Sequence, residues 1–125
     1  MLNRDDLKTQ VAQVTTDEAN FGGDDAVAVP QNMRRFIYAI KAINEYDGAN
    51  LLTLRKVENA AAVETIDYVQ FATQYETWKD PDELKEDSAP LYIVEGKGDT
   101  GDSYLKAVTD NGNAYLTIWY IDAPA

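Results

Sequence analysis

The chain has 125 residues, the usual length of one domain, and contains neither cysteine nor histidine. This composition excludes disulfides and Cys/His zinc sites, and it removes the commonest general base and the thiol nucleophile from any enzyme mechanism. The net charge of −11, from 22 acidic and 11 basic residues, disfavours direct binding to nucleic-acid phosphates or to anionic membrane surfaces.

No apolar run approaches the ~20 residues of a membrane-spanning helix. The first ten residues mix two acids with two bases, so they lack the apolar core of a signal peptide. We therefore expect synthesis in the cytoplasm and no contact with a membrane. The acids gather in residues 1–30 and 76–102, away from the most strand-like segments.

Residues 1–25 are expected to form an arm that precedes a β-sandwich domain over residues 26–125. Within the arm, residues 3–14 match a short helix with Asn3 as its N-cap. Apolar residues at i, i+4 and i+7 would mark one thin stripe on that helix. These residues are Leu7, Val11 and Val14. The stripe is too narrow for a deep core, so its side chains are candidate partner contacts; a frayed terminus is the alternative.

From residue 26 onward, apolar and polar residues alternate with the period of a strand. Both faces of the run 35–44 are largely apolar, which indicates a strand that packs on a core and is also covered on its outer side. The other expected strands are 26–29, 51–57, 64–71, 91–95, 104–109 and 114–121. Short strands between regular turn signals predict an all-β fold, an antiparallel β-sandwich or jelly roll with at most one or two short helices.

Two local signals make specific predictions about connections. The pair Asn111-Gly112 lies between two alternating runs and predicts a hairpin that joins 104–109 to 114–121 through a type I′ turn. Asp80 followed by Pro81 and Glu83 matches the start of a short helix, as N-cap, first helical position and capping-box partner. Residues 73–78 are expected to be irregular.

No arrangement of residues indicates an active site. Neither Ser88 nor Ser103 lies in a G-x-S-x-G motif, and the sequence has no P-loop and no G-x-G-x-x-G. The acids of 80–87 and of 99–102 lack the ligand spacing of an EF-hand loop, so a solvated helix and an ordinary turn explain them better than calcium sites. We expect no enzyme activity, no metal site and no cofactor.

Two further pairs of residues are candidate partner contacts. Tyr75 and Trp78 lie outside the clear strands and beside an acidic stretch. Aromatic side chains are enriched in protein interfaces, and they can also stack on sugars. Arg34 and Arg35 are adjacent cations at the start of a strand. They pair either with a neighbouring subunit or with acidic loops of their own chain.

Five segments follow one another in a familiar layout. They are 29–41 (VPQNMRRFIYAIK), 50–56 (NLLTLRK), 90–96 (PLYIVEG), 105–108 (LKAV) and 114–122 (AYLTIWYID). This layout spans roughly residues 27–122 and resembles the small capsid decoration (cement) proteins of tailed viruses, in pattern rather than through an invariant motif.

The resemblance implies a β-sandwich, commonly a homotrimer, that sits on the capsid surface of a virion and clamps neighbouring subunits of the major capsid protein. It also implies that residues 1–25 reach a partner, with Leu7, Val11 and Val14 as apolar contacts, and it carries no catalytic residues. The alternative is a carbohydrate-binding sandwich module of a receptor-binding or adhesion protein that uses Tyr75 and Trp78.

Overall fold

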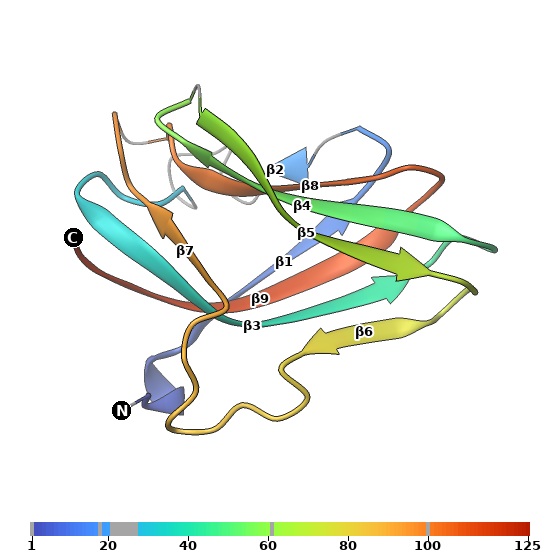
Figure 1. Cartoon of the computed structure of the whole chain (residues 1–125), viewed down its shortest axis with the longest axis horizontal. Coiled ribbons are helices and arrows are strands. Elements are labelled where there is room, and N and C mark those ends of the chain that lie inside the picture. The colour runs from blue at the N-terminus through green and yellow to red at the C-terminus, as the bar shows by residue number, and fades with distance from the viewer. Residues whose placement is uncertain (1, 18, 21–27, 61, 100) are drawn as a thin grey trace.

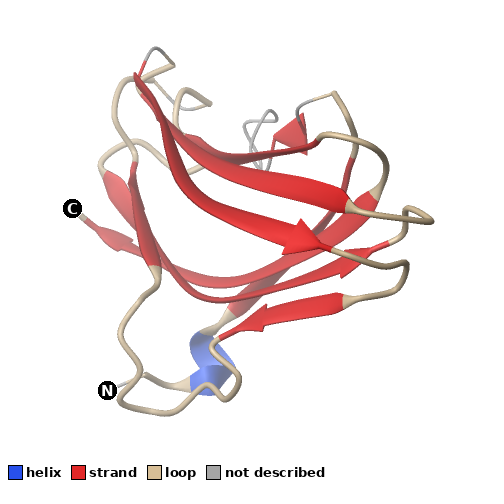
Figure 2. Cartoon of the chain, turned by 45° about the vertical axis from the view of Figure 1, so that its right-hand side comes forward, coloured by secondary structure: helices blue, strands red, loops and turns tan. Residues whose placement is uncertain are grey.

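The computed structural model describes residues 2–17, 19–20, 28–60, 62–99 and 101–125 of the chain. Within these ranges, two antiparallel sheets pack face to face, which confirms the predicted β-sandwich (Figures 1 and 2). One short 3₁₀ helix, η1 (Arg4–Asp6), accompanies the strands. No helix in the described ranges is long and apolar enough to cross a membrane.

The nine strands of the described ranges are divided between a sheet of five and a sheet of four. The first sheet has the order β1 (Lys8–Val14), β9 (Ala114–Pro124), β3 (Met33–Asn44) and β6 (Thr77–Asp80), with β7 (Tyr92–Glu95) also paired to β3. The second sheet has the order β2 (Ala19–Asn20), β8 (Tyr104–Thr109), β4 (Asn50–Glu58) and β5 (Ala62–Phe71). Six of the seven predicted strands therefore exist, with ends that differ by a few residues, and the exception is the one predicted over 26–29.

The hydrophobic core lies between the two sheets and is built by alternate residues of each strand. Its largest fully buried side chains come from β3, β4, β5, β8 and β9. They include Phe71, Ile37, Ile40, Leu52, Leu54, Leu105, Leu116 and Ile118. Tyr92 on β7 also ties the sheets together, because its hydroxyl donates a short hydrogen bond to Asp67 on β5. Burial and this bond raise the pKa of Tyr92 far above its ordinary value.

The helix predicted over residues 3–14 is wrong. Only Arg4–Asp6 is helical, and β1 follows at once, paired with β9 from Lys8 to Val14. A strand turns successive side chains to opposite faces, so Val14 is buried in the core while Val11 is 60% exposed. The predicted arm is therefore, over these seven residues, an edge strand of the sandwich.

Part of the predicted arm and of the next strand cannot be compared with the structure. Residues 21–27 lie outside the described residues, and they include the end of the arm and the first half of the strand predicted over 26–29. Ala28 and Val29 are buried but belong to no strand.

The predicted hairpin between residues 104–109 and 114–121 is also wrong, because β8 and β9 belong to different sheets. Residues 110–113 cross from one sheet to the other, and the buried side chain of Asn50 holds them there. Its Oδ1 accepts the N–H groups of Asn111 at 3.1 Å and Gly112 at 3.2 Å. Neither residue has the positive φ that a type I′ turn requires.

The helix predicted to start at Asp80 does not form. Asp80 is the last residue of β6 and lies opposite Ile40 of β3, so its backbone is committed to a sheet rather than to a cap. Residues 81–91 form turns and irregular backbone. The N–H of Leu2 donates to the carbonyl of Glu86 at 2.8 Å, which ties this segment to the start of the chain. Thr77 and Trp78, expected to be irregular, begin β6.

One ion pair is buried inside the sandwich. Arg35 on β3 is 4% exposed and meets Asp122, which lies opposite it on β9. Its Nε lies 2.8 Å from Oδ1 of Asp122, and its Nη2 lies 2.9 Å from Oδ2, a bidentate geometry. The guanidinium carbon also stands 4.1 Å from the ring centre of Tyr120, close enough for a cation–π contact.

Candidate functional site

The structure separates the seven residues expected at a partner surface into exposed and buried ones. Val14 and Arg35 are buried, and Arg35 is bound to Asp122 of its own chain. The acid that pairs with Arg35 thus lies on the neighbouring strand β9, and not in an acidic loop as the sequence suggested. Neither Val14 nor Arg35 therefore presents its side chain at the surface. Leu7 is half-buried and Val11 is exposed.

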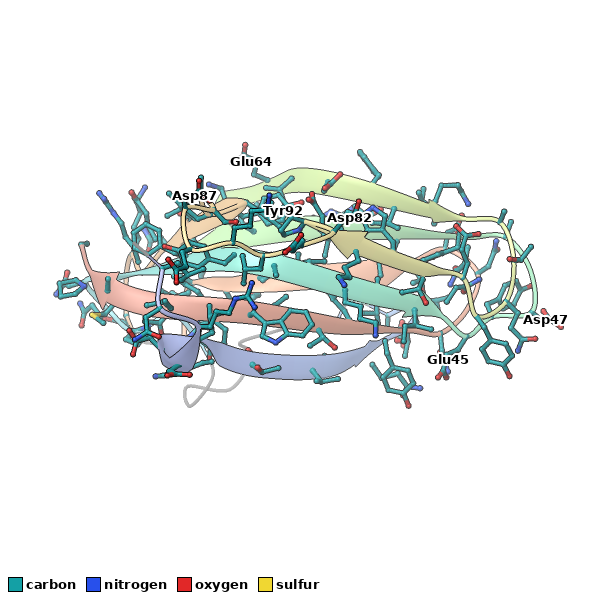
Figure 3. All side chains as sticks on the ribbon, turned by 90° about the horizontal axis from the view of Figure 1, so that it is seen from below. Glu45, Asp47, Glu64, Asp82, Asp87 and Tyr92 are labelled. Atoms are coloured by element: carbon teal, nitrogen blue, oxygen red, sulfur yellow. The ribbon has the colours of Figure 1, made fainter. Side chains whose placement is uncertain are left out.

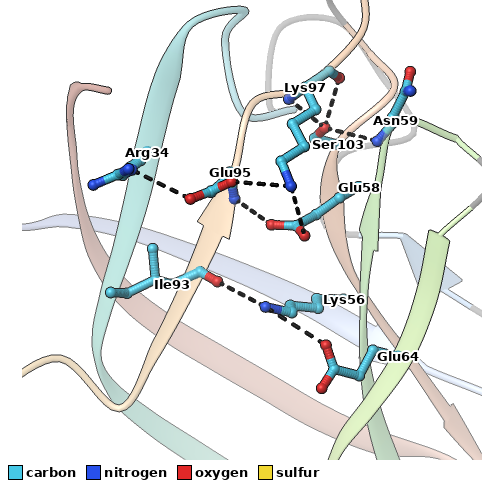
Figure 4. A network of polar contacts seen from close by, with 9 residues as sticks. All are labelled: Arg34, Lys56, Glu58, Asn59, Glu64, Ile93, Glu95, Lys97 and Ser103. Atoms are coloured by element: carbon cyan, nitrogen blue, oxygen red, sulfur yellow. Dashed lines mark hydrogen bonds and ion pairs between the residues drawn. The ribbon is translucent and has the colours of Figure 1, made fainter.

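Arg34 belongs to a network of charged groups that joins β3, β7 and β4 (Figure 4). Its Nε lies 3.5 Å from the carboxylate of Glu95. Lys97 places its Nζ 3.1 Å from Glu95 and 3.9 Å from Glu58. The N–H of Glu95 donates to Glu58 at 2.7 Å. Arg34 is thus partly exposed and paired within its own chain.

The hydrogen bond from Lys97 lowers the pKa of Glu95, and the positive charge of Lys97 adds to this effect. The same bond raises the pKa of Lys97, as do the negative charges of Glu95 and Glu58. The contribution of Glu95 to stability is therefore present above the ordinary glutamate pKa, about 4.3, and is lost as the pH falls through the lowered value. The contribution of Lys97 to stability is present below the ordinary lysine pKa, about 10.4, and is lost as the pH rises through the raised pKa of Lys97.

Lys97→Met is expected to lower the melting temperature slightly between these limits, because the variant loses the pairing with Glu95. The difference from the wild type should shrink as the pH falls below about 4.3, where the wild type loses the same pairing. Thermal unfolding followed by circular dichroism over pH 2–9 measures this. Lys85→Met, in an exposed loop, is the control. A difference that stays constant through the acid range would contradict the prediction.

Tyr75 and Trp78 do not share a surface. Trp78 lies on β6, opposite Ala42 of β3, and packs against the hydrophobic core. Tyr75 is 70% exposed in the connection before β6 and has a φ of 64°. A left-handed backbone is uncommon for a bulky residue, and here the N–H of Tyr75 is fixed by a 2.7 Å bond to the carbonyl of Asn44.

The face of the first sheet that points away from the core carries many apolar side chains among polar ones. Residues directly opposite in an antiparallel sheet share a face, and the pairing of β1, β9, β3, β6 and β7 puts one set of side chains on the outside. We call this set the outer face. It consists of Thr9, Val11, Gln13, Arg34, Phe36, Ala39, Lys41, Ile43, Thr77, Lys79, Ile93, Glu95, Tyr115, Thr117, Trp119, Ile121 and Ala123. The prediction that the strand over 35–44 carries apolar residues on both faces is confirmed.

The outer face carries four charged residues, namely Arg34 and Glu95, which pair with each other, and two lysines. Lys41 on β3 and Lys79 on β6 lie directly opposite each other, where like charges repel. No ion pair joins either ammonium group to an acid among the described residues. In a chain with a net charge of −11, this face therefore combines apolar area with unpaired positive charge.

The outer face is hollowed beside the middle of β3. The hollow measures about 680 Å³, and its lining includes Trp119 and Lys41 from the sheet, Leu7 from the chain before β1, and Leu84 and Asp82 from the segment after β6. The N-terminal segment and residues 81–84 thus border the outer face beside Lys41 and Trp119.

A second candidate surface lies at the end of the sandwich where three connections meet. We call residues 45–49, 72–76 and 110–113 the loop end (Figure 1). The buried Asn44 links two of these connections, because its Nδ2 donates to the carbonyls of Thr73 at 2.8 Å and Gly48 at 3.0 Å. Asn50 adds the third connection by donating to the Oδ1 of Asn44 at 3.1 Å and to the carbonyl of Gly112 at 3.0 Å.

Polar side chains dominate the loop end. In Figure 3, Glu45 and Asp47 project from this end, far from Asp87. They line a shallow hollow of about 440 Å³ together with Tyr46 and Gln74. Sequence reasoning found Tyr75 here but missed Tyr46, and the signal that was available is the run of polar and aromatic residues at 45–50 around a glycine.

The described residues contain no group of three or more acids that could hold a metal ion. Figure 3 shows Asp47 far from Glu64, Asp82 and Asp87. No protein-family model matches the chain, and no curated protein matches its sequence.

Proposed function

We propose that this protein is a structural virion protein that decorates and stabilises an assembled capsid by binding neighbouring capsid subunits. On this proposal it is made in the host cytoplasm, is located on the capsid surface and acts as a homotrimer. Its partner is the major capsid protein. It binds no nucleic acid and no membrane, and it is not an enzyme.

The observation that carries the proposal is the outer face. A sheet face that combines exposed apolar side chains with two unpaired lysines is suited to docking on another protein. The lysines indicate that the complementary surface is acidic, since electrostatic complementarity sets register and excludes wrong partners. The β-sandwich fold agrees with what the sequence resemblance implies.

The proposed mode of contact differs from the one that the resemblance implies. Instead of a free arm, β1 offers Val11 at the edge of the outer face, and Leu7 contributes to the hollow beside it. Leu7 and Val11 thus stay in the proposed contact, through a strand rather than through a helix.

The test is co-sedimentation with capsid shells assembled without this protein. Lys41→Glu combined with Lys79→Glu is expected to weaken binding by about tenfold or more, because two favourable charge contacts become repulsive. The apolar part of the face is tested separately by Val11→Asp.

The matched control is Arg55→Glu combined with Lys106→Glu. These two cations also lie opposite each other, on β4 and β8, and the substitutions change the net charge equally. We expect this variant to bind as the wild type does, once circular dichroism has shown that it folds. Failure of the wild type to bind any cognate shell would contradict the proposal. If both double variants weakened shell binding equally, the outer face would not be the contact surface.

A further inference from the structure

The loop end has a different chemistry from the outer face. Its hollow is lined by Tyr46, two carboxylates and two primary amides, and among the described residues no aliphatic side chain contributes to it. Protein interfaces are held by buried apolar or aromatic anchors in a desolvated centre. A shallow, polar hollow with one aromatic ring is poorly suited to that kind of contact.

The ring of Tyr46 is held in place rather than left free. It packs against the backbone of Gly112, where an added Cβ would lie 2.3 Å from the Cδ1 of Tyr46. The N–H of Tyr46 donates to the Oδ1 of the buried Asn44 at 3.1 Å. Gln74 beside it donates to the carbonyl of Glu45 at 3.2 Å. A binding surface that is already ordered loses little conformational entropy when a ligand arrives.

We propose that the loop end binds a neutral saccharide. One face of a sugar ring is apolar and can stack on Tyr46, while its hydroxyl groups donate to Glu45 and Asp47 and exchange hydrogen bonds with the amides of Gln74 and Asn113. The two carboxylates, in a chain with a net charge of −11, select against sialylated and sulfated sugars. Tyr75 provides a second exposed ring on the same end.

This inference is independent of the capsid proposal, because it concerns other residues on another surface. The two surfaces share no residue, so substitutions in one can be tested without changing the other. Each proposal can therefore fail without the other.

The experiment is binding of the full chain to an array of uncharged, sialylated and sulfated oligosaccharides, with titration calorimetry on the best ligand. We expect binding to uncharged members only. Tyr46→Ala should weaken it by about tenfold or more, and Tyr46→Phe should keep most of it because the ring remains. The matched control is Tyr68→Ala, which removes a 62% exposed tyrosine from β5.

If Tyr46→Ala does not fold, Asp47→Ala combined with Gln74→Ala takes its place, since both side chains are exposed. A wild type that binds no uncharged oligosaccharide would overturn the inference, as would a folded Tyr46→Ala with unchanged affinity. Loss of shell binding by Tyr46→Ala, without any bound sugar, would make the loop end a protein contact and would also overturn it.

Discussion

Asp122→Ala is expected to lower the free energy of unfolding by about 3–5 kcal/mol, because it removes the carboxylate that binds two nitrogens of the buried Arg35 guanidinium. Arg35 is 4% exposed, and two of its nitrogens bond to the lost carboxylate at 2.8 and 2.9 Å. The cation–π contact with Tyr120 and the 3.3 Å bond to the carbonyl of Ala28 remain, but they do not neutralise the charge. Urea unfolding followed by tryptophan fluorescence measures the change.

The double variant Arg35→Met with Asp122→Leu is the informative control. When apolar side chains of similar size replace both partners, neither buried charge of the pair is left behind. We therefore expect most of the lost stability to return. If Asp122→Ala alone cost less than about 1 kcal/mol, the pair would behave like an exposed salt bridge and its buried geometry would be wrong.

The second large effect is expected from Asn50→Ala, at about 2–4 kcal/mol. Asn50 is fully buried, and its side chain accepts the N–H groups of Asn111 and Gly112. A polar group that loses its partner away from water costs roughly 1–3 kcal/mol, and this substitution strands two N–H groups at once. Urea unfolding gives the stability, and amide hydrogen exchange should show faster exchange at residues 110–113.

Asn111→Ala is the matched control, because it removes an asparagine from the same connection. Asn111 is exposed, and its Nδ2 makes a 2.9 Å bond to the carbonyl of Ala49 at the surface. We expect a loss below about 1 kcal/mol, as for an exposed hydrogen bond. Equal losses in the two variants would mean that the buried position of Asn50 contributes nothing.

The sequence predicted the fold class and most of the strands because a two-residue period is a local signal. The run 35–44 and the run 114–121 alternate clearly, and both are strands that differ from the prediction by a few residues at most. A period of this kind needs no knowledge of distant residues.

The connections could not be predicted because they depend on residues far away in the chain. The pair Asn111-Gly112 matches a hairpin turn locally, but Asn50, sixty residues earlier, binds its backbone and directs the chain into the other sheet. Likewise, the spacing of Leu7, Val11 and Val14 fits a helix on its own. Residues 8–14 instead form a strand because they pair with β9, and in a strand Val11 and Val14 point in opposite directions.

The candidate surfaces were predictable only in part. Apolar residues on both faces of 35–44 indicated a sheet face that needs covering, and Phe36 and Ile43 on β3 are part of the outer face. Lys79 and Trp119 were missed, because only the register of three strands places them beside Lys41. No pattern along the sequence contains that register.

The position of β9 between β1 and β3 has a consequence for how the chain folds. The first strand, β1, pairs with the last strand, β9. The first sheet therefore cannot form in full until residues 114–124 have left the ribosome. Until then β1 and β3 lack their common neighbour and expose unpaired backbone. We expect folding to be completed only once residues 114–124 are available, on the millisecond-to-second scale of chains dominated by distant pairings.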